Sequence, residues 1–224
     1  MKICEIFSSI EGEGIRAGYL CTFIRSVGCS CKCSWCDTKF SFEEDESTQN
    51  LSVDEIVKKC HNLGNERVTF TGGEPLIQPQ ALDLIKALIK EGFMVNVETN
   101  GSVNLKSFVD YRNSDVFASE NLIFTVDYKC PSSGMTDKMV EDNYVYCNSN
   151  DVLKFVVADQ KDLMVMKNWV FEHPFTYQNI FVSPVFGQIE PKELVEFLKT
   201  NKLQNVRLQL QLHKFVYPPE MRGV

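Results

Sequence analysis

The chain has 224 residues, of which 44% are hydrophobic and 24% are charged, a composition typical of a globular protein and not of a disordered or fibrous one. Thirty acidic residues against 23 basic ones give a net charge of -7, and no long basic run could follow nucleic-acid phosphates. No apolar run approaches the roughly 18 residues of a membrane span, and the start, Met1 to Glu5, lacks the long apolar stretch of a signal peptide. We therefore expect one cytoplasmic domain over 1–224, with neither nucleic acid nor membrane as partner.

Strands and helices alternate along most of the chain. A strand at 20–26 comes first, followed by a helix that a capping box at Ser52 opens and Gly64 ends. This rhythm favours a parallel α/β sheet with right-handed crossovers, and we predict a partial, open parallel β/α barrel; a flat doubly wound sheet is the alternative. Later strands are predicted at 68–70, 93–98, 121–127, 152–157, 180–184 and 206–212, and later helices from Pro79 to Gly92 and near 104–112, 160–172 and 190–201.

The unusual polar residues follow the predicted strands. Parallel α/β folds bind their ligands beyond the C-terminal ends of the strands, so we expect these residues to converge on one site. They are Cys29 to Asp37, Gly72 to Pro75, Glu98 to Asn100, Asp127 to Lys129, Ser183 with Pro184, and His213.

Nine cysteines are present, and four of them, Cys29, Cys31, Cys33 and Cys36, fall within eight residues. In a reducing compartment, crowded thiols more often bind metal or react than form disulfides, whereas the five scattered cysteines are expected to be buried apolar residues. Cys29, Cys33 and Cys36 form C-x-x-x-C-x-x-C, which can hold a four-iron four-sulfur cluster and leave one iron open. A zinc-bearing interaction module is the alternative, but no nearby His or second Cys pair supplies the fourth ligand of a structural zinc site.

The cysteine loop resembles the signature of the radical S-adenosylmethionine (SAM) superfamily, C-x-x-x-C-x-aromatic-C, in which Trp35 is the aromatic residue. The segment Thr71 to Pro75 resembles the superfamily's GGEP segment, which binds the methionyl amine of SAM. The resemblance implies an open barrel of the radical SAM type. It also implies a 4Fe-4S cluster, with SAM bound at the open iron and cleaved to a 5′-deoxyadenosyl radical. Cys31 fits the signature spacing less well, and we expect it to be a bystander.

Both ends of the chain resemble the 7-carboxy-7-deazaguanine synthase family of queuosine biosynthesis. Phe7 to Gly14 reads F-S-S-I-E-G-E-G, with Glu11 where that family usually has Gln, and the chain closes with Q-L-H-K and R-G-V. The resemblance implies a lyase that converts 6-carboxy-5,6,7,8-tetrahydropterin to 7-carboxy-7-deazaguanine with loss of ammonia and regenerates SAM. It further implies Mg²⁺, a homodimer and an electron donor such as flavodoxin. A glycyl-radical activating enzyme, which acts on a partner protein, is the alternative.

The resemblance also implies a role for each matching residue. The cluster ligands would be Cys29, Cys33 and Cys36, and Thr38 would hold Mg²⁺ together with the substrate carboxylate, since oxygen donors suit this cation. Arg25 would pair with that carboxylate bidentately. The residues expected to bind SAM are Trp35, Cys36, Asp37, Gly73, Glu74, Asp127, Tyr128 and Lys129, with Ser183 to Val185 as further contacts. The residues expected to bind the pterin are Ile10, Glu11, Gly12, Glu13, Arg25, Thr71, His213 and the terminal carboxylate of Val224.

Overall fold

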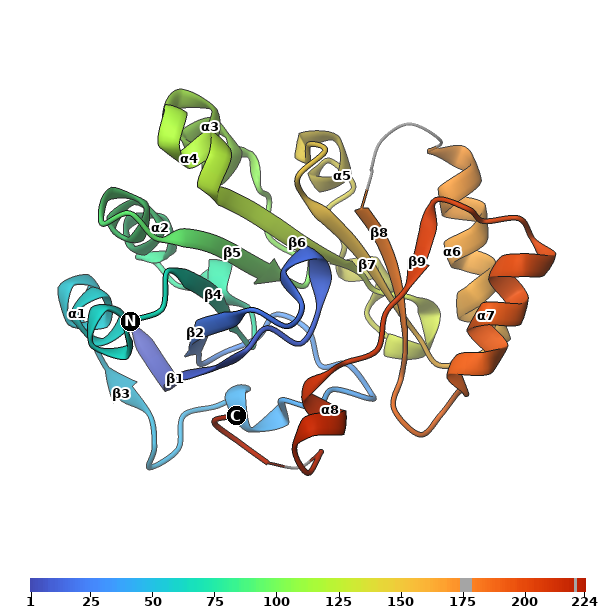
Figure 1. Cartoon of the computed structure of the whole chain (residues 1–224), viewed down its shortest axis with the longest axis horizontal. Helices are drawn as coiled ribbons and strands as arrows, with labels where there is room; N and C mark the ends of the chain where they lie inside the picture. Colours follow the sequence, from blue (N-terminus) through green and yellow to red (C-terminus); the bar gives the residue numbers. More distant parts are fainter. Residues whose placement is uncertain (174–178, 220) are drawn as a thin grey trace.

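The computed structural model describes residues 1–173, 179–219 and 221–224. The sheet of these residues is curved and has strand order β3-β1-β2-β4-β5-β6-β7-β8-β9, in which β3 and β9 are the two edge strands and do not pair with each other (Figure 1). The open parallel barrel predicted from the sequence is thus confirmed. The strands are β1 Lys2–Ile10, β2 Leu20–Ser26, β3 Gln49–Asn50, β4 Arg67–Gly72, β5 Met94–Thr99, β6 Leu122–Tyr128, β7 Val152–Val157, β8 Asn179–Pro184 and β9 Val206–Leu208.

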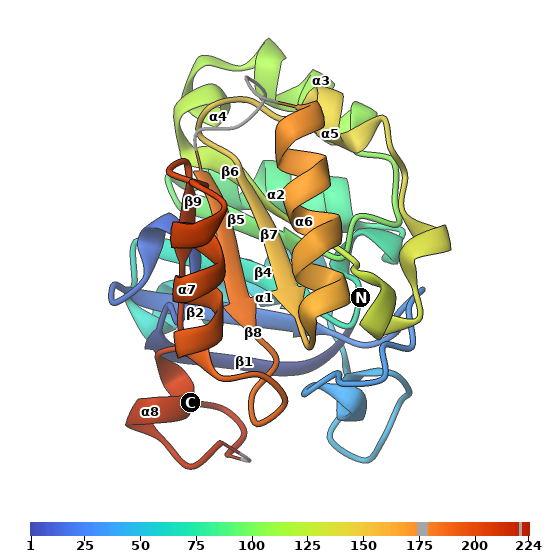
Figure 2. The same cartoon turned by 90° about the vertical axis from the view of Figure 1, so that its right-hand side faces the viewer.

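Helices cover the outer side of the sheet, and Figure 2 shows α6 and α7 lying over β7 and β8. Helix α1 illustrates how local sequence sets a boundary: Ser52 and Glu55 form the predicted capping box, and Gly64 ends the helix in the left-handed conformation with φ of 74°. Among the described residues, no helix has the length and apolar character that crossing a membrane requires. The helices are α1 Val53–Leu63, α2 Ala81–Lys90, α3 Lys106–Ser114, α4 Val116–Asn121, α5 Asn143–Tyr146, α6 Gln160–Glu172, α7 Pro191–Thr200 and α8 His213–Val216.

Strand β1 is the main departure from the predicted elements. It pairs antiparallel with β2, from Ile3 opposite Ser26 to Ile10 opposite Leu20, so the sheet is mixed at this edge. The polar Glu5 within β1 breaks the apolar pattern by which a strand is predicted. In the fold its carboxylate accepts a hydrogen bond from the guanidinium of Arg25 on the neighbouring strand β2. The prediction of a strand over 206–212 was also too long. The short helices α4, α5 and α8 were not predicted, because four to six residues carry too little helical periodicity.

The sheet has an apolar outer face and a polar inner face. Successive side chains of a strand point to opposite faces, and residues paired in register share a face. On the outer face, Ile24, Phe70 and Val97 are paired across β2, β4 and β5 and are fully buried against the helices. On the inner face, Arg25 pairs with Thr71, Glu98 with Thr125, and Asp127 with Lys154. The polar residues therefore face the hollow of the curved sheet.

A buried ion pair between α3 and the start of β7 provides a stability test. Arg112 Nη1 lies 2.8 Å from each carboxylate oxygen of Asp151, and both side chains are almost fully buried. Removing one partner of such a pair leaves the other charge buried and unpaired. We therefore expect Arg112→Met to lower the unfolding free energy by about 3–5 kcal/mol in urea denaturation. Lys106→Met, which breaks the exposed pair with Asp110, should cost about 0.5 kcal/mol or less. Equal losses in the two variants would contradict this reading.

Candidate functional site

One cavity occupies the inner side of the sheet, at the C-terminal ends of the parallel strands. It brings together most of the residues singled out in the sequence, although they come from segments more than 200 residues apart. The predicted residues that line it are Ile10, Glu11, Gly12, Glu13, Arg25, Cys29, Cys33, Trp35, Cys36, Asp37, Thr38, Thr71, Gly73, Asp127, Lys129, His213 and Val224, with Val185 among the further contacts.

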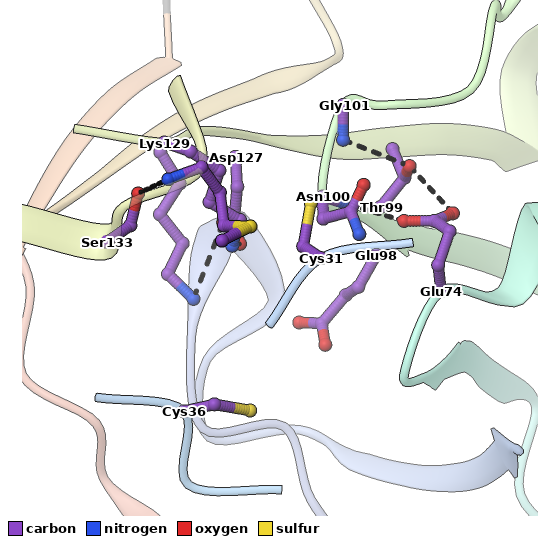
Figure 3. Close-up of polar contacts among 12 residues, drawn as sticks. Cys31, Cys36, Glu74, Glu98, Thr99, Asn100, Gly101, Asp127, Lys129 and Ser133 are labelled. Atoms are coloured by element: carbon purple, nitrogen blue, oxygen red, sulfur yellow. Dashed lines mark hydrogen bonds and ion pairs between the residues drawn. The ribbon is translucent and has the colours of Figure 1, made fainter. Parts of the chain in front are cut away.

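The cysteine loop lies at one side of this cavity and has no regular secondary structure. Its ends are held by the rest of the site: Asn100 Nδ2 lies 3.5 Å from Cys29 Sγ, and Trp35 Nε1 donates to Ser132 Oγ over 3.0 Å. Figure 3 shows Cys36 set apart from Cys31 across the open centre of the site. Cys31 also lines the cavity and is buried, so its predicted role as a bystander stays a prediction.

The donors present fit an iron–sulfur cluster. Cys29, Cys33 and Cys36 are free thiols on one cavity wall, and thiolates are the ligands that such clusters require. In the parts of the chain that the structure describes, no three Cys, His, Asp or Glu side chains converge to hold a single metal ion. A four-iron cluster needs no such convergence, because each thiolate binds a different iron.

Gly73 allows the GGEP segment to lie directly against the cysteine loop. A Cβ at this position would lie 2.2 Å from the carbonyl oxygen of Gly28 and 2.9 Å from Cys29 Cβ. Both distances are shorter than any van der Waals contact, and one neighbour is backbone that cannot rotate away. The close approach therefore depends on glycine.

Glu74 does not line the cavity, in contrast to its expected role in binding SAM. Its carboxylate is fully buried and accepts hydrogen bonds from Thr99 Oγ1 at 2.9 Å, Asn100 N at 2.7 Å and Leu76 N at 3.1 Å (Figure 3). Burial outweighs these bonds and raises the pKa of Glu74 to about 7. The side chain thus ties the GGEP segment to the end of β5.

Tyr128 also lies away from the cavity, for a reason of register. It pairs with Phe155 on the outer face, whereas the preceding Asp127 pairs with Lys154 on the inner face. Its ring packs between sheet and helices, with centroids 5.1 Å from Phe155 and 6.3 Å from Trp169. The predicted contact of Tyr128 with SAM is thus not supported by its position. Ser183, another predicted contact, is buried and is not part of the cavity wall.

The segment that carries His213 closes the cavity against the loop between β1 and β2. Leu212 N donates to the carbonyl oxygen of Gly12 over 3.1 Å, and a Cβ on Gly12 would lie 2.4 Å from His213 Nδ1. Because Gly12 has no side chain, there is room for the imidazole of His213. Lys214 Nζ lies 2.9 Å from Asp37 Oδ2, and although burial acts in the opposite direction, this ammonium helps to lower the pKa of Asp37 to about 2. The pair links this segment to the cysteine loop.

The last residues reach back to β1 and β2. Glu5 bridges two guanidinium groups: its Oε2 lies 3.1 Å from Arg25 Nε, and its Oε1 lies 2.9 Å from Arg222 Nε. Phe40 stacks below them, with its ring centre 3.8 Å from the Arg222 guanidinium. These contacts hold the tail at the cavity, where Val224 forms part of the wall.

The comparisons with known proteins agree with this geometry. Residues 23–118 match the model of the Radical SAM superfamily. The chain is 41% identical to the 7-carboxy-7-deazaguanine synthase of Clostridium acetobutylicum, covering 100% of this chain and 99% of that protein. The synthase of Methanospirillum hungatei is 37% identical, covering 98% of this chain and 86% of that protein.

The chain belongs to the 7-carboxy-7-deazaguanine synthase family, within the radical SAM superfamily. Its fold is similar to that of QueE from Escherichia coli, with a TM-score of 0.71 at 23% identity over 94% of this chain and 93% of that one. SuiB of Streptococcus suis, solved bound to S-adenosylmethionine, gives a TM-score of 0.59 at 14% identity, covering 86% of this chain and 51% of that one.

Four further charged residues of this family member line the cavity and were not among the predicted site residues: Glu5, Lys154, Lys214 and Arg222. Lys154 left a signal, since it is the only charged residue in the buried run V-L-K-F-V-V of β7. Glu5 lies in a strand that was not predicted. Lys214 and Arg222 lie in the closing segment, where their partners depend on the tertiary fold.

Two cavity carboxyls, Glu11 and Glu98, lie in surroundings that disfavour their charged forms. Thr69 Oγ1 donates to Glu11 Oε2 over 2.5 Å and itself accepts from Cys21 Sγ, while Thr71 Oγ1 donates to Glu98 over 3.1 Å. Burial and the nearby Glu98 carboxylate raise the pKa of Glu11 to about 8. Burial likewise raises the pKa of Glu98. At neutral pH, Glu11 is thus a neutral acid that can donate a hydrogen bond.

This proton makes the stability of the protein depend on pH. A carboxyl titrates near 4.5 in the unfolded chain but near 8 at Glu11, so between these values unfolding releases a proton and becomes easier as the pH rises. Glu11→Gln removes this contribution. We therefore expect the melting temperature of Glu11→Gln, relative to that of the parent protein, to increase as the pH rises from 5 to 8, measured by calorimetry. Glu43→Gln, an exposed surface substitution, serves as the control, and a pH-independent difference for Glu11→Gln would refute the assignment.

Proposed function

We propose that this chain is a 7-carboxy-7-deazaguanine synthase that converts 6-carboxy-5,6,7,8-tetrahydropterin to 7-carboxy-7-deazaguanine with loss of ammonia. One observation carries the proposal: the three-thiolate loop and an oxygen- and nitrogen-rich set of side chains line the same cavity. Membership of the synthase family supports it. The product is a rearranged small molecule, so both substrate and radical source must meet within one enclosed site.

On the cofactor side, Cys29, Cys33 and Cys36 would hold a 4Fe-4S cluster, whose electron cleaves SAM when both are bound. Gly73 presents backbone beside the cysteine loop, where a SAM amino acid group could approach. Lys129 Nζ lies 5.6 Å from the centre of the Trp35 ring and holds Asp127 Oδ2 at 2.5 Å. This arrangement leaves a polar wall for a nucleoside, as the resemblance implies for Trp35, Asp37, Asp127 and Lys129.

On the substrate side, Arg25 supplies the positive charge that a pterin carboxylate requires. Glu5 holds its Nε, and the two terminal nitrogens of this cavity-lining residue would bind the substrate carboxylate as a bidentate donor. Glu13 keeps one buried oxygen, Oε1, without a partner among the described residues, and this acceptor suits a ring N–H. Thr38 offers a hydroxyl oxygen for Mg²⁺ at the same wall, and omitting Mg²⁺ from the assay tests that part.

The remaining residues of the pocket shape its specificity. Thr71 lies beside Arg25 in the cavity wall, and His213 lies beside Gly12 in the Ile10 to Gly12 segment of the same wall. Glu11 can donate a hydrogen bond as a neutral acid, in the manner of the Gln usual in the family. The family resemblance further supports a homodimer and a flavodoxin-type electron donor. An activating enzyme for a partner protein is not favoured, because the curated relatives are synthases.

The decisive experiment is anaerobic reconstitution with iron and sulfide, followed by incubation with SAM, reductant, Mg²⁺ and the tetrahydropterin. We expect about four irons per chain and formation of the deazaguanine acid, detected by mass spectrometry. Cys33→Ser should lose both the cluster and the product. Cys31→Ser is the matched control from the same loop and should retain both. Iron-loaded protein that cleaves SAM but never forms this product would refute the substrate, and zinc without iron would refute the radical mechanism.

The position of Val224 allows a separate test of the terminal carboxylate. We expect that appending two glycines after Val224 lowers turnover at least about tenfold, because the carboxylate is displaced from the substrate. Iron content should be unchanged, since the cluster ligands lie elsewhere in the chain. Two glycines inserted after Asp45, in the exposed acidic run Glu43-Glu44-Asp45-Glu46, provide the control for added length. Unchanged activity of the extended chain would remove Val224 from the site.

A further inference from the structure

Lys154 is a buried cation that the sequence-based site did not include. It lies in the middle of β7, its side chain is 10% exposed, and it forms part of the cavity wall. The pairing of β6 with β7 places it directly opposite Asp127 on the inner face. Burying a lysine in a strand is unfavourable unless its charge is paired. The presence of Lys154 therefore requires a partner of opposite charge and indicates a functional role.

Its contacts join the two halves of the cavity. Lys154 Nζ lies 2.6 Å from Glu13 Oε2 and 3.9 Å from Asp127 Oδ1. Glu13 precedes the short helix between β1 and β2, on the side assigned to the pterin. Asp127 ends β6, and its other oxygen is held at 2.5 Å by Lys129, on the side assigned to SAM. One ammonium thus sets the separation of a substrate-side and a cofactor-side carboxylate.

The charges around Lys154 keep it protonated. Burial alone lowers its pKa, but the carboxylates of Glu13, Asp127 and Glu98 more than reverse this and raise the pKa above its ordinary value. Lys154 holds one oxygen of Glu13, which fixes this carboxylate at the cavity wall, and the other oxygen, Oε1, is buried without a partner in the described chain. An acceptor held in this way is ready for a donor on a ligand.

We propose that Lys154 is a positioning residue that aligns the pterin with SAM by holding Glu13 and Asp127 at a set separation. This inference rests on the proposed function. Lys154 need not touch either ligand, since its effect passes through the two carboxylates. Without it, Glu13 would be a buried carboxylate that lacks its cation and lies near the Glu98 carboxylate, and Asp127 would be held by Lys129 alone.

The test compares Lys154→Met with Lys154→Arg, which keeps the charge. The first measurement is the affinity of cluster-free protein for 6-carboxypterin by calorimetry. The second is 5′-deoxyadenosine released per product formed by reconstituted enzyme. A synthase that regenerates SAM releases little 5′-deoxyadenosine, so release reports a radical formed beside a misplaced substrate. We expect Lys154→Met to weaken binding and to raise the ratio, each about tenfold or more, and Lys154→Arg to restore most of both.

Controls separate this inference from the proposed function. Lys106→Met, an exposed substitution, should behave as the parent protein in both measurements. If Lys154→Met does not fold, Lys154→Gln, which can still donate to Glu13, is judged by the same two measurements. An unchanged affinity or an unchanged ratio overturns the role of Lys154 alone. A parent protein that neither binds the pterin nor forms product overturns the proposed function, and this inference with it.

Discussion

The need to neutralise buried charge organises this protein. The inner face of the sheet carries charged residues on β1, β2, β5, β6 and β7, and none could remain ionised there without a partner. The chain Glu13–Lys154–Asp127–Lys129 alternates in sign across the cavity, and Glu5 does the same between Arg25 and Arg222. Because each of these side chains is held by the next, the cavity walls stay in place without a ligand. The contrast is Glu11, which forms no ion pair among the described residues and whose pKa burial raises, so that its neutral form is favoured.

A second constraint is the contact between irregular segments and the ends of strands. The cysteine loop has no helix or strand to shape it, and its position follows from three neighbours: the GGEP backbone at Gly73, the Asn100 amide and the Ser132 hydroxyl. Glu74 ties the first two together from behind. Loops held by a rigid scaffold in this way carry function in many parallel α/β folds. Here the ends of the strands and the cysteine loop share one network of hydrogen bonds.

The last segment of the chain, from Leu212 to Val224, forms part of the cavity wall. Its contacts with Gly12, Asp37 and Glu5 reach three separate parts of the wall. Two of these are ion pairs at the protein surface or cavity edge, which contribute modestly to stability and weaken with salt. Their value lies in placement, since they bring His213 and Val224 to a cavity whose other walls come from the parallel strands.

Local sequence determined the elements with strong periodicity and caps, such as α1 between Ser52 and Gly64, and the apolar strand β7. It also determined the chemistry of the cysteine loop, because ligand spacing within a few residues is a property of the chain itself. Strand β1, the outward orientation of Tyr128 and the partners of Lys154 were decided only by the tertiary structure. Each depends on which strand lies beside which, and in what register, and a one-residue shift would turn every one of these side chains to the other face.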